Sequence, residues 1–408
     1  MTKSTISVGL IGAGAMGRGI AIQVKNTPGL ELRWVADIAD ESAREVGRLS
    51  GAPSSTDALH SLSNSPVDVV VEATNSIAAA ATYSFASLES GAHVVLMNAE
   101  VDLALAPLLQ YEAKSRNLIV TSDAGDQHGV LAKMIEEADL LGFSVVQAGN
   151  IKGFLDRYAT PESIAAEAAK RRLSATQCCA YTDGTKLHIE MAVLANAFGY
   201  NVPAGGMQGP QAEHVTEALD LFDFDAYGGT PRIDYILGAE PGGGVYLVVK
   251  LKEGFPEDQR FFLDYYKLGD GPYYLMYRPY HLCHLETPKA IFEAASGRSW
   301  LAPGQSNALL SPSPCGEKPG TDVYAFAKRP LRAGERVAHA IGSEHCYGLV
   351  SERRTNQVPI TLLESPATLV RDLEKDEPIQ WSDIECSPCS LLDHWRRQES
   401  LIRHVLDW

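Results

Sequence analysis

The chain has 408 residues, 45% of them apolar, and a formal net charge of −16. This length predicts two or three domains with ample cores. The acidic balance argues against a nucleic-acid partner, because proteins that bind phosphate backbones concentrate lysine and arginine. No apolar run approaches the roughly 18 residues of a membrane span, so we expect no membrane partner. We expect a cytoplasmic protein without a signal peptide, since a strand pattern begins almost at once.

The first motif is a glycine-rich turn between a strand and a helix. The apolar run 6–11 leads directly into the turn, and a helical pattern over 15–25 follows it. This order and the glycine spacing are typical of a dinucleotide-binding turn, which places a pyrophosphate on the N-terminus of the helix. The sequence therefore predicts a nicotinamide cofactor site here. Its predicted residues are Gly12, Gly14, Ala15, Met16 and Gly17.

A second strand pattern, 31–36, ends in Asp37, about 20 residues past the last glycine, where the fingerprint expects an acid that binds the ribose. A carboxylate at this position would repel the 2′-phosphate of NADP. We therefore expect an NAD(P) cofactor, with NAD slightly favoured over NADP.

Short apolar strands alternate with helices as far as residue 121, which predicts an α/β fold with a parallel, doubly wound sheet. The expected strands are 6–11, 31–36, 67–71, 93–96 and 118–121, and the expected helices are 15–25, 40–50, 77–89 and 102–116. Ligands bind at the carboxyl ends of such strands. The candidate cofactor residues there are Thr74, Asn75, Asn98 and Glu100, although each of them is also an ordinary residue for a βα loop.

The central part of the chain predicts an α+β substrate and oligomerisation domain. A glycine-rich acidic loop, 122–129, precedes a helix that runs to about 141, and a strand is expected at 144–148 with a turn at 149–154. Thr160-Pro161 starts a helix that ends near 172, and a longer helical pattern covers 175–198. A strand is expected at 245–251.

Three charged residues of the longer helical pattern are candidate catalytic groups. At about 100° per residue, Asp183, Lys186 and Glu190 share one helical face. Two acids beside a lysine can hold its ammonium group and tune its proton affinity. The alternative is an exposed stripe of ion pairs.

The stretch 277–288 is rich in reactive side chains. Arg278 and His281 are candidates to bind an anionic or hydroxylated substrate. A metal site made of His281, His284 and Glu286 is an alternative, but the spacing matches no defined metal motif, so we expect no metal.

A proline-rich linker is expected at 311–320, followed by short strands at 323–327, 336–337, 349–350, 358–363 and 367–370 and a helix from 391 to 408. Seven cysteines, an odd number in a long chain, indicate reduced thiols. The isolated Cys386–Cys389 pair has no second pair and is not expected to bind a metal. The expected domains are 1–148, 149–310 and 321–408.

With these motifs, the chain resembles the homoserine dehydrogenase-like NAD(P)-binding oxidoreductases that carry a C-terminal SAF domain. The resemblance lies in the glycine turn, in 122–129, 149–154 and 183–191, and in 331–335 and 369–384, which are similar to SAF repeats. It implies a small β domain at the C-terminus and a lysine that moves the substrate proton, for which Lys186 is the match. The group includes the DXR-like reductoisomerases (DRL).

These observations predict an oxidoreductase, or an oxidoisomerase, that transfers hydride to or from a small hydroxylated acid or sugar-derived substrate, and we expect a homo-oligomer. One alternative is a DRL-type reductoisomerase acting on 1-deoxy-D-xylulose 5-phosphate, which needs a phosphate site; the candidates are Lys152, Arg157, Arg232 and Arg278. Another is a nucleotide-sensing protein without catalytic activity.

Overall fold

The computed structural model describes residues 5–171, 173–255, 257–297 and 320–404. Almost all of the expected linker at 311–320 therefore lies outside the described residues. No helix in the described part of the chain is long and apolar enough to cross a membrane.

The first domain is the predicted doubly wound parallel sheet, and this prediction is confirmed. Its six strands lie in the order β3-β2-β1-β4-β5-β6, and every pair is parallel. The strands are β1 (Ile6–Ile11), β2 (Leu30–Ala36), β3 (Ser54–Ser55), β4 (Val69–Glu72), β5 (His93–Leu96) and β6 (Val120–Ser122). The helices are α1 (Ala15–Asn26), α2 (Asp40–Ser50), α3 (Ala58–Asn64), α4 (Ile77–Glu89), α5 (Ala99–Ser115) and α6 (Gln127–Leu140). The strand order reverses between β1 and β4, so a ligand crevice is expected where these two strands end.

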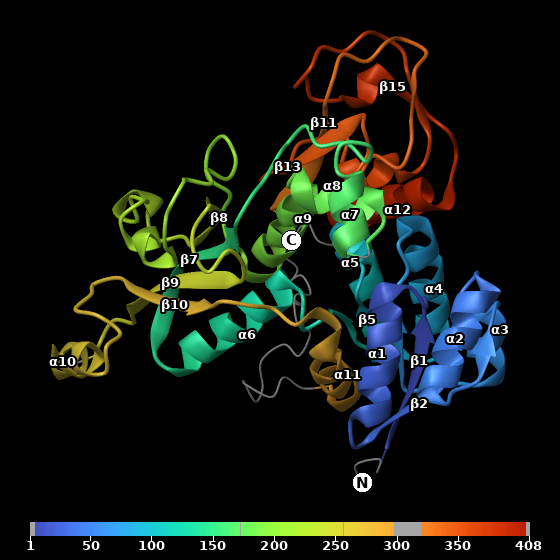
Figure 1. Cartoon of the computed structure of the whole chain (residues 1–408), viewed down its shortest axis with the longest axis horizontal. Coiled ribbons are helices and arrows are strands. Elements are labelled where there is room, and N and C mark those ends of the chain that lie inside the picture. Colours follow the sequence, from blue (N-terminus) through green and yellow to red (C-terminus); the bar gives the residue numbers. More distant parts are fainter. Residues whose placement is uncertain (1–4, 172, 256, 298–319, 405–408) are drawn as a thin grey trace.

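A second, mixed sheet lies beside the first domain, in the green and yellow part of Figure 1. Its strand order is β10-β9-β7-β8, with β7 (Phe143–Lys152), β8 (Arg232–Leu237), β9 (Val245–Leu251) and β10 (Tyr274–Arg278). The turn predicted at 149–154 is wrong over its first four residues, because Asn150 pairs with Tyr235 on one side and Val245 on the other. The expected boundary at residue 148 thus falls inside β7.

Helix α6 packs on β7 and β9 of this sheet, and further helical segments follow β7 in the described chain. They are α7 (Ala165–Arg171), α8 (Ala175–Thr182), α9 (Thr185–Phe198), α10 (Glu257–Tyr265) and α11 (Thr287–Ser296), with the short 3-10 turns η1 (Val215–Leu219) and η2 (Asp225–Tyr227). A further 3-10 turn, η3 (Cys283–Leu285), precedes α11. Helix α11 packs against α1, β4 and β5, so the chain returns to the first domain after the second sheet.

The long helix predicted at 175–198 is interrupted, and this prediction is wrong. Helix α8 ends with Asp183 as its C-cap residue, and Gly184 adopts a left-handed conformation with φ of 84° before α9 begins. The change of direction removes Asp183 from the face that carries Lys186 and Glu190.

The third region contains two small antiparallel sheets. Strands β11 (Thr321–Ala327) and β13 (Cys346–Glu352) form one, and β12 (Arg336–Val337), β14 (Ala367–Leu369) and β15 (Ile384–Cys386) form the other. The strand predicted at 358–363 is wrong, because Ile360–Glu364 forms the 3-10 turn η4; a second turn, η5, covers Trp381–Asp383. Strands β11 and β13 pack on α9, and α12 (Ser390–His404) packs on α5, as the orange and red segments of Figure 1 show.

Candidate active site

The glycine turn has the close packing that the fingerprint requires. A Cβ atom at Gly12, whose φ is 101°, would lie 2.5 Å from the carbonyl oxygen of Ala73, and one at Gly17 would lie 1.9 Å from the oxygen of Gly12. By contrast, a Cβ atom at Gly14 would meet no atom within 4 Å. Open space therefore lies beside Gly14 at the N-terminus of α1, where Ala15 and Met16 begin the helix and a pyrophosphate would fit.

Asp37 lies against this turn. One carboxylate oxygen accepts a hydrogen bond from the backbone N–H of Ala13 at 2.7 Å, and the other accepts from the N–H of Ala39 at 2.8 Å. The acid thus fixes the turn, and each of its oxygens keeps a lone pair for a ribose hydroxyl.

The loops after β4 and β5 meet beside the turn. The Asn98 side chain accepts from the N–H groups of Glu100 and Val101, which caps α5, and donates to the carbonyl of Thr74 at 3.2 Å. Asn75 is exposed and Thr74 is half-buried. Both loops follow the carboxyl ends of their strands, and the loop after β4 also lies against Gly12.

Lys186 reaches from the second domain to the first. Its Nζ atom lies 2.8 Å from the Oε1 atom of Glu100, and only 12% of its side chain is exposed. Burial alone would lower the pKa of Lys186, but the negative charge of Glu100 holds this pKa above its ordinary value. Lys186 therefore stays a cation at neutral pH.

Glu190 lies one turn further along α9, near Lys152 of β7. Burial raises the pKa of Glu190 to about 8, with a further contribution from the charge of Asp126, and its Oε2 atom has no hydrogen-bond partner. Burial lowers the pKa of Lys152, while the charge of Glu190 opposes that shift. The pKa values of an acid and a base are thus both shifted toward neutral pH.

Gln127 positions Lys152 and is itself held by Asn150. The Oε1 atom of Gln127 accepts from Lys152 Nζ at 2.6 Å and from Asn150 Nδ2 at 2.9 Å. Lys152 entered the sequence analysis only as a phosphate candidate, and Gln127 and Asn150 were not singled out. Asn150 and Lys152 lay in a stretch expected to be a turn, so only the polar residues of 122–129 and 149–154 pointed to this cluster.

Asp183 does not belong to the cluster. Its carboxylate forms a buried ion pair with Lys328 of the third region, with 2.7 Å between Oδ2 and Nζ. The prediction that it lies beside Lys186 is wrong, because the break at Gly184 turns it away.

His281 lies near Lys152, whereas Arg278 contacts Glu286 and Tyr280. The Arg278 guanidinium makes two hydrogen bonds to Glu286, at 3.0 and 2.9 Å, and Glu286 also pairs with Lys133. Burial lowers the pKa of His281, so its imidazole is neutral at neutral pH. The alternative metal site of His281, His284 and Glu286 is not assembled, because Glu286 is held by these two cations and the His284 ring lies against Gly19.

The four cations considered for a phosphate site contact different groups. Arg157 lies over the ring of Tyr347, Arg232 lies over Tyr227, Arg278 binds Glu286 and Lys152 binds Gln127. No two of these four cations contact the same group in these interactions.

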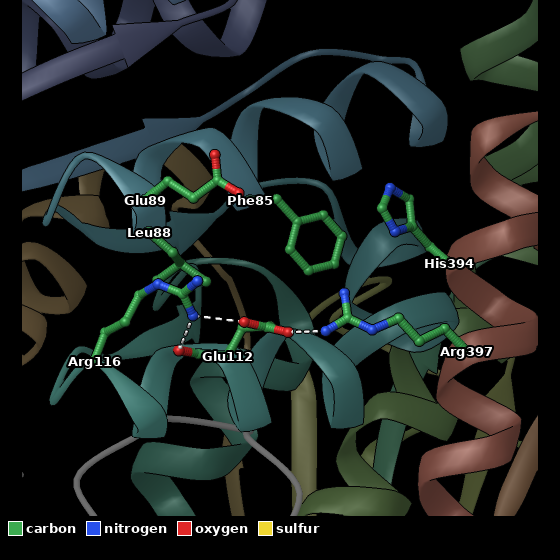
Figure 2. Close-up of a pocket in the computed structure, with 7 residues that line it drawn as sticks. All are labelled: Phe85, Leu88, Glu89, Glu112, Arg116, His394 and Arg397. Atoms are coloured by element: carbon green, nitrogen blue, oxygen red, sulfur yellow. Dashed lines mark hydrogen bonds and ion pairs between the residues drawn. The ribbon is translucent and has the colours of Figure 1, made fainter.

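A surface pocket lies between α4, α5 and α12, away from the glycine turn (Figure 2). Glu112 lies between Arg116 and Arg397 and forms ion pairs with both, while the Phe85 and His394 rings stack with 4.5 Å between centroids. The Glu112 carboxylate is already shared by two cations, and none of the candidate cofactor residues lines the pocket. We therefore do not assign the active site to this pocket.

Two family models match successive parts of the chain. Residues 12–120 match the model of the homoserine dehydrogenase NAD-binding domain, and residues 125–287 match that of the catalytic domain of oxidoreductase DRL. A search of curated proteins found no significant match.

Solved structures with similar folds are distant. A putative myo-inositol dehydrogenase from Sinorhizobium meliloti is 14% identical, with 75% of this chain and 94% of that chain covered and a TM-score of 0.43. A probable dehydrogenase from Thermotoga maritima is 14% identical over 71% and 89%, with a TM-score of 0.42. An NAD-binding oxidoreductase from Klebsiella pneumoniae is 20% identical with a TM-score of 0.29, and the match spans 37% of this chain and 43% of that chain, less than half the length of that relative.

The two family models together cover the glycine turn, the Lys186–Glu100 pair and the Lys152–Glu190 pair. The chain therefore carries an NAD-binding domain similar to that of homoserine dehydrogenase, followed by a domain similar to the catalytic domain of oxidoreductase DRL.

Proposed function

We propose that this enzyme transfers hydride to or from the carbinol or carbonyl carbon of a small hydroxylated acid or sugar-derived substrate bound between the first domain and α9. The observation that carries the proposal is the pair of Lys152 and Glu190, whose pKa values are shifted in opposite directions toward neutrality. Such pairs suit general acid–base catalysis, which is most efficient when the pKa lies near the working pH.

Each charged group has a separate role in this proposal. The nicotinamide, held by the Gly12–Gly17 turn, Asp37 and the loops at Thr74 and Asn98, would exchange the hydride. Glu190 and Lys152 hold or move the proton of the substrate hydroxyl. Lys186 stays positively charged and stabilises the oxygen as negative charge develops on it. Glu100 positions the Lys186 ammonium group.

The test is a substrate panel of hydroxylated acids and sugar acids, followed by NAD(H) absorbance. With an active substrate, Glu190→Gln and Lys152→Met should each lower kcat by about 100-fold. Glu190→Gln should also remove an ionisation near pH 8 from the rate profile, while NADH affinity stays unchanged. The exposed Lys170→Met is the control for the loss of a lysine. Parent-like rates in both active-site variants would contradict the assignment.

The match to the DRL catalytic domain favours a second candidate, a reductoisomerase acting on a phosphorylated ketose. The different partners of Arg157, Arg232 and Arg278 weigh against it. Turnover of 1-deoxy-D-xylulose 5-phosphate with NADPH would establish this candidate. Cofactor binding without turnover of any compound in the panel would instead favour a nucleotide-sensing protein.

A further inference from the structure

Three side chains with metal-binding atoms meet beside the Lys152–Glu190 pair. One ligand atom of each of Asp126, His281 and Cys283 lies within 4.8 Å of the other two, and each residue is partly buried. The Cys283 Sγ and His281 Nδ1 atoms are 3.4 Å apart. Asp126 comes from the loop before α6 and the other two residues from the segment after β10, so the fold brings together positions more than a hundred residues apart in sequence.

The backbone holds these two segments together. The N–H of Cys283 donates to the carbonyl of Gly125 at 3.0 Å. A Cβ atom at Gly125 would lie 1.8 Å from the carbonyl oxygen of Cys283, so only glycine permits this approach. Cys283 itself has a φ of 42°, an uncommon value for a residue other than glycine. The close approach fixes Asp126 opposite His281 and Cys283.

The charge around the three side chains suits a divalent cation. Asp126 offers a carboxylate oxygen and Cys283 offers a sulfur atom. His281 offers an imidazole nitrogen, and a neutral imidazole is a common metal ligand. A carboxylate and a thiolate would together carry two negative charges, which a divalent ion would balance.

We propose that Asp126, His281 and Cys283 bind a zinc ion. Thiolate and imidazole ligands favour zinc over magnesium or calcium, and three protein ligands leave the fourth tetrahedral position open, as in catalytic zinc sites. In the reaction proposed above, the open position would take a substrate oxygen. This catalytic role rests on the proposed function, whereas the metal binding does not.

The test is zinc affinity of the full chain, stripped with a chelator and titrated in competition with a chromophoric zinc indicator. We expect one zinc ion per chain. Cys283→Ser and His281→Gln should weaken binding by at least about 100-fold, since even residues that only orient metal ligands contribute 10- to 100-fold. Cys386→Ser is the matched control, because Cys386 and Cys389 form the competing thiol pair and Cys386 is exposed; it should leave the affinity unchanged.

A second measurement locates the ion. Cobalt added in place of zinc should give a thiolate-to-metal charge-transfer band that disappears in Cys283→Ser and persists in Cys386→Ser. NADH affinity of Cys283→Ser, measured in parallel, verifies that the variant is folded. The absence of stoichiometric zinc, or zinc lost on Cys386→Ser and kept in Cys283→Ser, would overturn the proposal. Zinc binding without any substrate turnover would support the metal site and contradict only the proposed function.

Discussion

The Nζ atom of Lys328 lies 2.7 Å from the Oδ2 atom of Asp183, and both side chains are almost fully buried. The same ammonium group donates to the carbonyls of Ala159 and Ser343 at 2.7 and 2.6 Å. Asp183 thus connects the end of α8 to the third region of the chain. Its charge is used for domain packing, so the proposed proton chemistry rests on residues of α9 and β7.

We expect Lys328→Met to destabilise the protein by about 3–5 kcal/mol, the usual cost of leaving a buried charge without its partner. Urea unfolding measures the change, with Lys170→Met as the exposed control, which should change stability by less than about 1 kcal/mol. The kcat of the folded Lys328→Met variant should stay close to that of the parent. A large fall in kcat with unchanged stability would place Asp183 and Lys328 in the chemistry instead.

The sequence predicted the first domain well and the contacts of the candidate site residues only in part, for physical reasons. Buried parallel strands and their helices leave strong local patterns, so β1, α2, α4 and β5 were predicted to the residue. Asp183 shows the opposite case. A helical pattern continues through 175–198, but Gly184 can adopt a positive φ, and the buried pair with Lys328 stabilises the break. A contact between positions 145 residues apart leaves no local pattern.

Lys152 shows a second limit. Its neighbours Gly149 and Gly153 suggest a turn, yet β8 and β9 pair with this segment from both sides and make it a central strand. The pKa shifts of Lys152 and Glu190 arise from burial, which depends on tertiary packing and not on spacing. The sequence therefore identified charged residues on α9 without showing which of them has a pKa shifted toward neutral pH.

We expect Gly14→Val to weaken NADH binding by at least tenfold, about 1.4 kcal/mol, with little change in stability. The backbone at this residue is extended and no atom lies within 4 Å of a Cβ, so valine fits the free protein and conflicts only with a bound pyrophosphate. Fluorescence titration with NADH measures the effect. Gly320→Val is the matched control, because Gly320 also has open space beside it and lies outside the turn. Unchanged affinity in folded Gly14→Val would refute the placement of the cofactor.

We expect NADH to bind at least tenfold more tightly than NADPH, about 1.4 kcal/mol. Asp37 lies against the turn with both oxygens oriented by backbone N–H groups, and its charge would repel a 2′-phosphate. Asp37→Ser should narrow or reverse the ratio of the two dissociation constants, whereas the exposed Asp40→Ser should leave it unchanged. A parent protein that prefers NADPH would show that cations elsewhere outweigh Asp37.

Glu190→Gln should change how stability depends on pH. Because the folded-state pKa of Glu190 is raised to about 8, the folded protein holds this proton more tightly than the unfolded chain. This tighter proton binding stabilises the folded protein. Its contribution is fully present below the ordinary pKa of 4.5 and is lost as the pH rises to about 8. Glutamine stays neutral, so the free energy of unfolding should increasingly favour the variant over this window, by up to about 1.4 kcal/mol per pH unit.

Urea unfolding of both proteins from about pH 5 to about pH 9 measures this difference. The exposed Glu167→Gln is the control: hydrogen bonds from Arg171 and Lys170 lower the pKa of Glu167, so its contribution changes only at acid pH. A constant difference between parent and Glu190→Gln across the range would mean that Glu190 is ionised in the folded protein at neutral pH.

Lys186→Met should lower kcat by about 100-fold while NADH affinity changes little. Lys186 is a buried cation paired with Glu100, and methionine keeps most of its apolar stem but cannot stabilise a developing negative charge. Because its raised pKa keeps Lys186 protonated at neutral pH, the loss should be similar across neutral pH and should not remove an ionisation from the rate profile. Glu190→Gln should remove one, so the two variants separate charge stabilisation from proton transfer.

The competing role for Lys186 is a structural ion pair between the two domains. Lys186→Arg distinguishes these roles, since arginine keeps the charge and can still pair with Glu100, but its planar fork presents different donors to a substrate oxygen. Parent-like stability with a persistent loss of kcat in Lys186→Arg supports direct contact with the substrate. If Lys186→Arg transfers hydride at the parent rate in a single turnover, Lys186 is a positioning residue. If Lys186→Met also reacts at the parent rate, the catalytic groups are Lys152, Glu190 and His281.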